Sequence, residues 1–229
     1  MSEKRLFDVD PALGRIASPT ARESLSAATV RVASLPIGRF EPAQLTDRDA
    51  LGLIVTNGLI ARTVEVPGGQ SIELISPWKM LQPWTVEQPS FTTTAWAVLD
   101  SARVYAIDSR LSREIAVHQE LRIELVGRGI QRAHVLTVSA AIESVVGVEN
   151  RVLLALWQLA EYCGSVSGDG VTMPLRLTHE MLATMIGSRR PSVTSALASL
   201  TDRGLIARRA DRSWLLLGSC PGGVARRAA

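Results

Sequence analysis

The chain has 229 residues, of which 46% are hydrophobic and 21% charged, and this length suits two small domains and a connector. No stretch is long and apolar enough to span a membrane, and the N-terminus lacks the hydrophobic segment of a secretory signal. A cytoplasmic protein without membrane partners is therefore expected. In that compartment Cys163 and Cys220, far apart and without a ligand cluster, stay reduced.

The net charge of +3 is unevenly divided along the chain. Residues 1–145 hold 15 Lys/Arg against 16 Asp/Glu, a net charge of −1, and residues 146–229 hold 10 against 6, a net charge of +4. Binding to nucleic-acid phosphates requires a basic excess of this kind. The excess is modest, so charge alone does not identify DNA as the partner.

The first part of the chain, after a short helix at Thr20–Ala27, consists of short apolar runs between turn residues. Strong turn signals stand at Asn57-Gly58 and at residues 67–70. Short strands at this spacing predict a sandwich, a barrel or a jelly roll. The predicted strands are Thr29–Leu35, Ala50–Thr56, Leu59–Val66, Ser71–Ile75, Ala95–Leu99 and Arg103–Ile107.

A long helix is predicted from Gln119 to Val146, after a short one at Asp108–Ala116. Gly127 and Gly129 depart from a good coiled coil, since each costs up to about 1 kcal/mol in a helix interior. An apolar stripe nevertheless runs along the long helix at helical spacing. Its members are Leu121, Leu125, Leu136, Ser139 and Ile142.

Gly147-Val148 would form a hinge into a C-terminal domain that opens with a helix at Glu149–Tyr162. A loop at Gly164–Gly170 and a strand at Val171–Leu175 follow. The pattern after that strand predicts two short helices around a tight turn.

Thr178 is suited to N-cap the first of these two helices. Gly187 ends it, because glycine enters the left-handed conformation without steric cost. Ser188 can cap the second helix, and Pro191 fits its first turn, where no backbone donor is needed. This is the layout of a helix-turn-helix, in which the second helix enters a DNA major groove.

The outward face of the second helix is rich in arginine and hydroxyl groups. An arginine can bond guanine in bidentate fashion, worth about 1–3 kcal/mol of discrimination, and hydroxyls suit phosphates. We expect Arg190 on a base, Arg189 on a phosphate or a base, and Ser195 at a specificity position. Thr178 and Ser192 are expected to contact phosphates, and Thr194 is a further residue expected to bind DNA. The alternative is an ordinary helical hairpin with a solvated basic turn.

Two further strands, Leu205–Arg208 and Ser213–Leu217, flank a basic turn and predict a hairpin. A helix-turn-helix followed by such a hairpin is a winged helix. Arg208, Arg209 and Arg212 would then lie beside the DNA backbone, unless the turn is only solvated.

The segment 177–206, LTHEMLATMIGSRRPSVTSALASLTDRGLI, resembles the DNA-binding domain of the Crp/Fnr superfamily of bacterial transcription regulators. The match covers residues 150–218 well and the remainder more loosely. Arg190 falls on a base-reading arginine of that family. Pro191 and Ser195 fall where members such as the catabolite activator protein carry charged base-readers, which implies a different operator.

The resemblance implies an α+β fold in three parts. Residues 1–117 would be a double-stranded β-helix (jelly-roll) sensor of the cyclic-nucleotide-binding type. Residues 118–147 would be a dimerisation helix and hinge, and residues 148–229 the winged helix-turn-helix domain. In the family the long helix pairs with its twin across a two-fold axis; the alternative here is packing only within its own chain. RNA polymerase is a further partner that the resemblance suggests.

The predicted sensor lacks the residues of the usual sensor chemistry. The first 117 residues contain no histidine and no cysteine, so a thiolate-held iron–sulfur cluster, a His- or Cys-ligated haem and a histidine metal site are not expected, and no cofactor is predicted. A weak carboxylate site for a hard cation stays open. Cyclic-nucleotide binders of the family also carry an arginine where this chain has Thr93, and a glycine-glutamate turn that it lacks. Cyclic AMP or GMP is therefore not the expected effector.

A pocket for a neutral or aromatic small molecule is one interpretation of the tryptophans in this region, and plain core packing is the other. The pocket residues would be Trp78, Gln82, Trp84, Thr93, Thr94 and Trp96.

The sequence thus predicts a homodimeric regulator that reads a near-palindromic site on double-stranded DNA, with an unknown small-molecule effector. The alternative is a small-molecule- or protein-binding module whose winged helix contacts proteins. An enzyme is not expected, because no Ser/His/Asp set, phosphate loop or metal cluster is visible.

Overall fold

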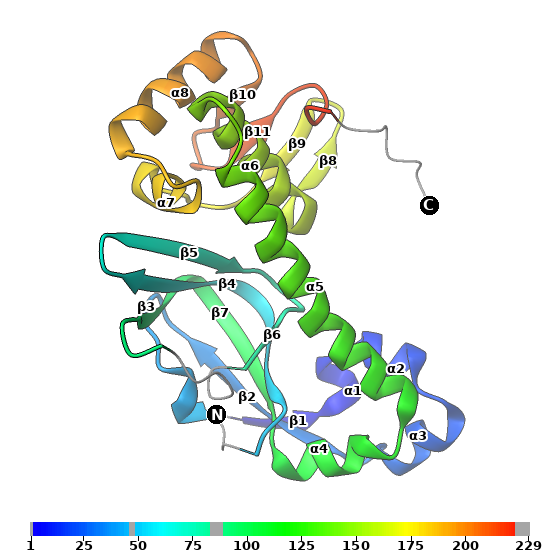
Figure 1. Cartoon of the computed structure of the whole chain (residues 1–229). Coiled ribbons are helices and arrows are strands. Elements are labelled where there is room, and N and C mark those ends of the chain that lie inside the picture. The colour runs from blue at the N-terminus through cyan, green and yellow to red at the C-terminus, as the bar shows by residue number, and fades with distance from the viewer. Residues whose placement is uncertain (1, 46–48, 83–88, 223–229) are drawn as a thin grey trace. The chain divides into compact units, whose positions relative to one another are not determined.

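The computed structural model in Figure 1 describes residues 2–45, 49–82 and 89–222. The chain forms two compact units, residues 1–69 with 73–135 and residues 70–72 with 136–229, which we call the N-terminal and C-terminal units. None of the helices within the described ranges has the length and apolar character to cross a membrane.

The N-terminal unit is built on an antiparallel sheet, as the sequence predicted. Its strands follow the order β1 (Ser2–Arg5), β2 (Thr29–Leu35), β7 (Thr93–Ile107), β4 (Gly52–Val66) and β5 (Gly69–Ile75). Two short strands are added, β3 (Gly38–Arg39) on β7 and β6 (Met80–Leu81) on β4. The two long strands β4 and β7 pair along nearly their whole length and form the centre of the sheet.

The predicted turn at Asn57-Gly58 was wrong, because both residues lie inside β4. The register between β4 and β7 shifts between Val55 and Ile60, so the pair of residues forms an irregularity in the ladder. Gly58 has φ +84°, and a Cβ atom there would lie within 3.0 Å of the β7 backbone. The two strands predicted on either side of residues 100–102 are likewise one strand, β7.

The N-terminal unit also contains short helices and the first part of a long one: α1 (Leu6–Val9), α2 (Pro11–Ile16), α3 (Pro19–Ser24), the 3₁₀ helix η1 (Pro42–Leu45), α4 (Ser109–Ala116) and the long α5 (Gln119–Glu143). α5 ends three residues before the predicted Val146. Its residues Leu121 and Leu125 are fully buried in one hydrophobic cluster with side chains of α1–α4, β2 and β7. The first part of α5 therefore packs into the core of its own unit.

A buried polar network connects α2, β7 and α5. The Asp10 carboxylate caps α2 by accepting from Leu13 N at 3.2 Å, accepts from the Tyr105 hydroxyl at 2.7 Å and pairs with the Arg128 guanidinium. Asp10 is 0% exposed and the Arg128 side chain 5%. Burial, followed by the Asp10 charge, raises the pKa of Tyr105 well above its ordinary value. Burial opposes the charge of Arg128, but the bonds to Asp10 and Glu124 hold its pKa above the ordinary value.

The C-terminal unit combines three helices with a second sheet. The helices are α6 (Val148–Cys163), α7 (His179–Met185) and α8 (Arg190–Asp202), and the strands follow the order β10 (Ile206–Arg208), β11 (Trp214–Leu216), β9 (Gly170–Met173) and β8 (Ser165–Ser167). The predicted loop at 164–170 was wrong, since it contains β8 and the turn into β9. Gly147, with φ +90°, is the N-cap of α6.

Candidate nucleic-acid interface

The helix-turn-helix begins with the predicted cap. Thr178 Oγ1 accepts from Met181 N at 3.1 Å and so starts α7. Leu182, Ala183 and Met185 bury the inner face of this helix. Gly187 follows its end with φ +57°, the left-handed conformation expected of it.

The predicted cap of α8 was wrong by one residue. Arg189, not Ser188, is the N-cap, and its side chain makes no capping bond. The backbone amide of Ser188 instead donates to Ala183 O at 2.9 Å, which closes the turn after α7. Pro191 occupies the first turn as predicted. Arg189 and Arg190 therefore occupy the N-cap and the first position of α8. The helix dipole also favours an anion at this end of the helix.

The inner and outer faces of α8 are clearly separated. Val193, Ala196, Leu197 and Leu200 are buried against the unit. The five residues predicted to contact DNA from this segment are all exposed: Arg189, Arg190, Ser192, Thr194 and Ser195. The outer face of α8 is thus exposed along the helix, as insertion into a DNA groove would require.

β10 and β11 form the predicted hairpin, in which Arg208 lies opposite Trp214. Arg208, Arg209 and Arg212 are exposed on it or on its turn. Arg209 lies 3.7 Å from Asp169, an exposed pair that adds little to stability. Burial, then the charge of Arg212, lowers the pKa of Arg208. The Asp211 carboxylate accepts hydrogen bonds from Ser213 N and Ser213 Oγ, and these bonds hold the turn. The same bonds lower the pKa of Asp211.

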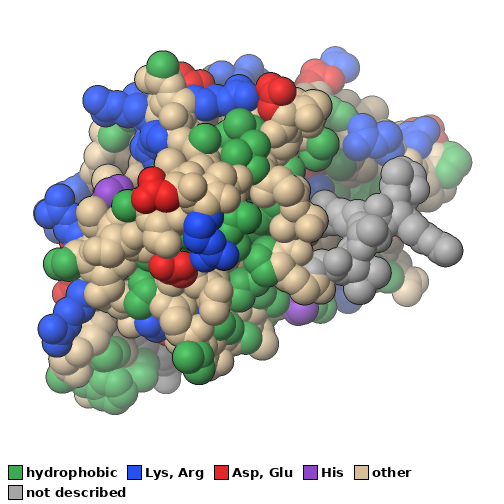
Figure 2. All heavy atoms as spheres, turned by 90° about the horizontal axis from the view of Figure 1, so that it is seen from above, with side chains coloured by type: hydrophobic (Ala, Val, Ile, Leu, Met, Phe, Trp, Pro, Cys, Tyr) green, Lys and Arg blue, Asp and Glu red, His purple; other side chains and the backbone are tan. Residues whose placement is uncertain are grey.

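The basic charge of the C-terminal unit is local rather than general. Figure 2 shows Lys and Arg side chains mainly around the edge of the face turned to the viewer, with carboxylates among them. Arg189 and Arg190 at the start of α8, and Arg208, Arg209 and Arg212 of the β10–β11 hairpin, are exposed cationic groups of this unit.

Two of the predicted DNA contacts line one groove of the C-terminal unit, between α8, the start of α7 and the hairpin. Thr194 comes from α8 and Arg208 from β10. His179 and Trp214 line it too, and the sequence analysis did not select them. The predicted strands, Leu205–Arg208 and Ser213–Leu217, place Arg208 opposite Ser213, so only the observed register of β10 and β11 brings Arg208 opposite Trp214.

The residues predicted to line an effector pocket in the N-terminal unit contact different neighbours. Trp78 is 42% exposed, has φ +67°, and lies with its ring centroid 5.9 Å from the Arg128 guanidinium. Gln82 donates to Leu51 O at 2.9 Å. Thr93 is exposed, Thr94 is half-buried, and the Trp96 ring lies 5.8 Å from the Arg62 guanidinium. Trp84 lies outside the described residues.

The predicted dimer stripe is divided between the core and the surface. Leu121 and Leu125 are core residues, Ile142 is 7% exposed, and Ser139 donates to Gln158 at 3.2 Å. Of the five, Leu136 is the large apolar side chain that is exposed. A second apolar stripe of α5 is exposed instead: Ile123 is 62%, Val126 54% and Ile130 65% exposed. Leu121 and Leu125 therefore pack in the core of their own unit and are not exposed on the surface of α5.

Within the described part of the chain, no group of three or more His, Cys, Asp or Glu side chains is placed to hold a metal ion.

Comparison with known proteins identifies the C-terminal unit. Residues 150–217 match the model of the Crp-like helix-turn-helix domain. The chain is 26% identical over 156 residues to the CRP-like cAMP-activated global transcriptional regulator of Mycobacterium tuberculosis, covering 67% of this chain and 70% of that protein.

Two solved structures show that the likeness extends to the fold of both units. A cyclic nucleotide-binding domain containing protein from Listeria monocytogenes has a TM-score of 0.66 at 15% identity, covering 90% of this chain and 96% of that one. FixK2 from Bradyrhizobium japonicum has a TM-score of 0.63 at 14% identity, covering 82% and 92%. The fold is the jelly-roll and winged helix-turn-helix architecture of the Crp/Fnr regulators. The chain therefore contains a region that matches a Crp-like helix-turn-helix domain, and over about two thirds of its length it is similar in sequence to a CRP-like transcriptional regulator.

Proposed function

We propose that this protein is a Crp-like transcription regulator, a homodimer that binds a near-palindromic DNA site, with α8 in the major groove. One observation carries the proposal: Arg189 and Arg190 lie exposed at the N-terminal end of the second helix of a Crp-like helix-turn-helix. Ser192 and Ser195 lie on the same outer face, and Arg208, Arg209 and Arg212 supply cations for the backbone. In this assignment residues 148–229 form the DNA-binding domain, residues 118–147 the dimerisation helix and hinge, and residues 1–117 the sensor.

The direct test is an electrophoretic shift with duplexes selected from a random library. Arg190→Ala should weaken binding to the selected site by about 1–3 kcal/mol, roughly 5- to 160-fold, and relax the preference at one position. Arg203→Ala is the matched control, because Arg203 ends the same helix and pairs with Glu149 at 2.9 Å. Failure to select any sequence at moderate salt would contradict the proposal and favour a protein-contacting role.

The proposed dimer seam is the exposed stripe of α5, not the buried one. Ile123, Val126, Ile130 and Ala133 are exposed and follow one another at steps of three, four and three residues. This is the spacing with which two helices pair along a coiled coil. Gly127 adjoins the stripe, and a Cβ atom there would meet nothing within 4 Å, which leaves room for a close partner.

Sedimentation of variants tests this seam. Ile130→Glu should produce monomers at micromolar concentration, because it buries a charge in the interface. Val166→Glu is the control, since Val166 is an exposed apolar residue of β8, 84% exposed, outside the stripe. A dimer that persists in Ile130→Glu at the same concentration would place the interface elsewhere.

We also propose that the sensor does not use the family's cyclic-nucleotide contacts. Thr93 is exposed on β7, at the position where the resemblance places an arginine. Calorimetric titration with cyclic AMP and cyclic GMP should give no saturable heat at millimolar ligand; a micromolar Kd for either would refute this.

A further inference from the structure

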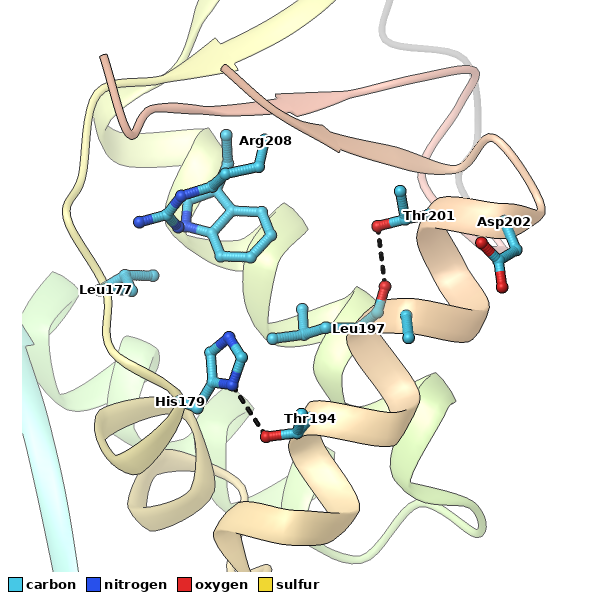
Figure 3. A pocket seen from close by; sticks show the side chains of 9 residues that line it. Leu177, His179, Thr194, Leu197, Thr201, Asp202 and Arg208 are labelled. Atoms are coloured by element: carbon cyan, nitrogen blue, oxygen red, sulfur yellow. Dashed lines mark hydrogen bonds between the residues drawn. The ribbon is translucent and has the colours of Figure 1, made fainter. Parts of the chain in front are cut away.

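α8, the start of α7 and the wing strands border an open groove of about 470 Å³, shown in Figure 3, which we call the wing groove. A volume of this size is within the range of small-molecule sites. Its lining residues are Leu177, His179, Thr194, Leu197, Ala198, Thr201, Asp202, Arg208 and Trp214.

The floor of the wing groove is apolar and rigid. Leu177, Leu197 and Trp214 are 2%, 5% and 4% exposed, so the fold holds these side chains in place. The Trp214 indole, which lies under the Arg208 guanidinium, forms part of this apolar floor. The floor therefore suits a ligand with a flat hydrocarbon body.

Two donors lie together at the Trp214 end of the groove. The Arg208 guanidinium carbon lies 4.2 Å from the centroid of the Trp214 ring, in a cation–π stack. The Trp214 Nε1 atom is buried and has no hydrogen-bond partner within the described part of the chain. A buried donor without an acceptor is unfavourable, and an anion next to a guanidinium can also accept from it. Asp202, the groove's carboxylate, lies at the other end, away from Arg208 and His179 (Figure 3).

His179 contributes an acceptor in its neutral form. The Thr194 hydroxyl donates its proton to Arg190 O at 3.1 Å, so at the 2.8 Å contact the Nδ1–H of His179 is the donor to Thr194 Oγ1. Nε2 of the neutral ring is then an acceptor. A ligand that carries a hydroxyl besides its anionic group can donate to it.

We propose that the wing groove binds a small aromatic carboxylate, with the carboxylate on Arg208 and Trp214 Nε1 and the ring on the apolar floor. A DNA phosphate would use Arg208 but leave the floor uncovered, so the lining fits an organic anion better. A ligand in the wing groove competes with DNA, since Thr194 and Arg208 belong to both sites. This second step, competition, rests on the proposed DNA binding, whereas the first step, binding of the carboxylate in the groove, does not.

NMR of the full chain labelled with ¹⁵N-tryptophan tests the first step. The chain has five tryptophans, and the indole signal of Trp214 is assigned with Trp214→Phe. Titration with 4-hydroxybenzoate should shift that signal saturably, with a Kd on the order of 1 mM or lower. The neutral analogue 4-hydroxybenzamide should bind at least about tenfold more weakly, because it lacks the charge-assisted bond.

Two variants locate the site. Arg208→Gln should weaken 4-hydroxybenzoate binding at least about tenfold. Arg176→Gln, which removes an exposed arginine that does not line the groove, should leave binding unchanged. The proposal is overturned if the Trp214 signal does not saturate up to roughly 20 mM ligand, far above that Kd. Equal binding by Arg208→Gln or by the amide overturns it as well.

A gel shift with the selected duplex tests the second step. 4-Hydroxybenzoate should raise the Kd for DNA in the wild-type chain in proportion to groove occupancy, and should not in Ala198→Leu, which fills the groove. Saturable binding without any change in DNA affinity refutes competition while the proposed DNA binding stands. Absence of DNA binding without ligand refutes the proposed function and leaves the groove site intact.

Discussion

Replacing Asp10 by alanine should strongly destabilise the N-terminal unit. The carboxylate is fully buried, and its loss leaves Arg128, 5% exposed, without its main counter-charge. It also removes the acceptor of the Tyr105 hydroxyl and the cap on Leu13 N. Removing one partner of a buried ion pair typically costs about 3–5 kcal/mol. Against a total of about 5–15 kcal/mol for a protein, such a loss should be plain in urea unfolding followed by circular dichroism.

Asp8→Ala is the matched control, since Asp8 is an exposed aspartate two residues earlier and its loss should cost less than about 0.5 kcal/mol. The double variant Asp10→Leu, Arg128→Met should recover much of the stability, because an apolar pair can replace a buried ion pair. The reasoning is refuted if Asp10→Ala loses less than about 1 kcal/mol of unfolding free energy, or if the double variant is no more stable than Asp10→Ala.

Three further predictions concern other parts of the chain. Gly58→Ala should destabilise the N-terminal unit by more than about 1 kcal/mol in the same urea assay, because φ is +84° and the β7 backbone fills the space. The hydrogen bond from Ser18 N lowers the pKa of the Glu120 carboxyl from its usual 4.5. The stability from this bond is therefore complete above pH 4.5 and is lost as the pH falls through the lowered pKa. An NMR titration of the Ser18 amide should show that acid transition, and Glu120→Gln should abolish it. Burial raises the pKa of Cys163 to about 12, so iodoacetamide at pH 8 should label Cys220 well before Cys163, as peptide mass spectrometry would show; equal labelling rates would contradict the burial argument.

The helix-turn-helix could be predicted because its signals are local. A cap, a left-handed glycine and a helical stripe each act within a few residues, and Thr178 and Gly187 took the predicted roles. Gly58 could not be interpreted in the same way. A glycine with positive φ serves both a hairpin turn and a strand irregularity, and only the pairing of β4 with β7 decides between them.

The long helix shows a second limit of sequence patterns. α5 carries two apolar stripes, one through Leu121 and Leu125 and one through Ile123 and Ile130. Both satisfy helical spacing, so periodicity cannot say which stripe covers the chain's own core and which is left for a partner. The answer depends on α1–α4, most of which carry too few residues for a periodic signal.

The hydroxyl groups of α8 and of the Thr178 cap, which lie on the proposed DNA-binding surface, differ in the hydrogen bonds that they already make. Thr178 Oγ1 accepts from Met181 N, so its proton is free to donate to a phosphate. The Ser195 hydroxyl donates to Pro191 O at 3.3 Å, which leaves it as an acceptor for the amino group of adenine or cytosine. Thr194 has both functions in use, between His179 and Arg190 O. In the proposed complex with DNA, Thr194 therefore contributes less than its exposure suggests, and we expect Arg190 and Ser195 to provide most of the sequence discrimination on α8.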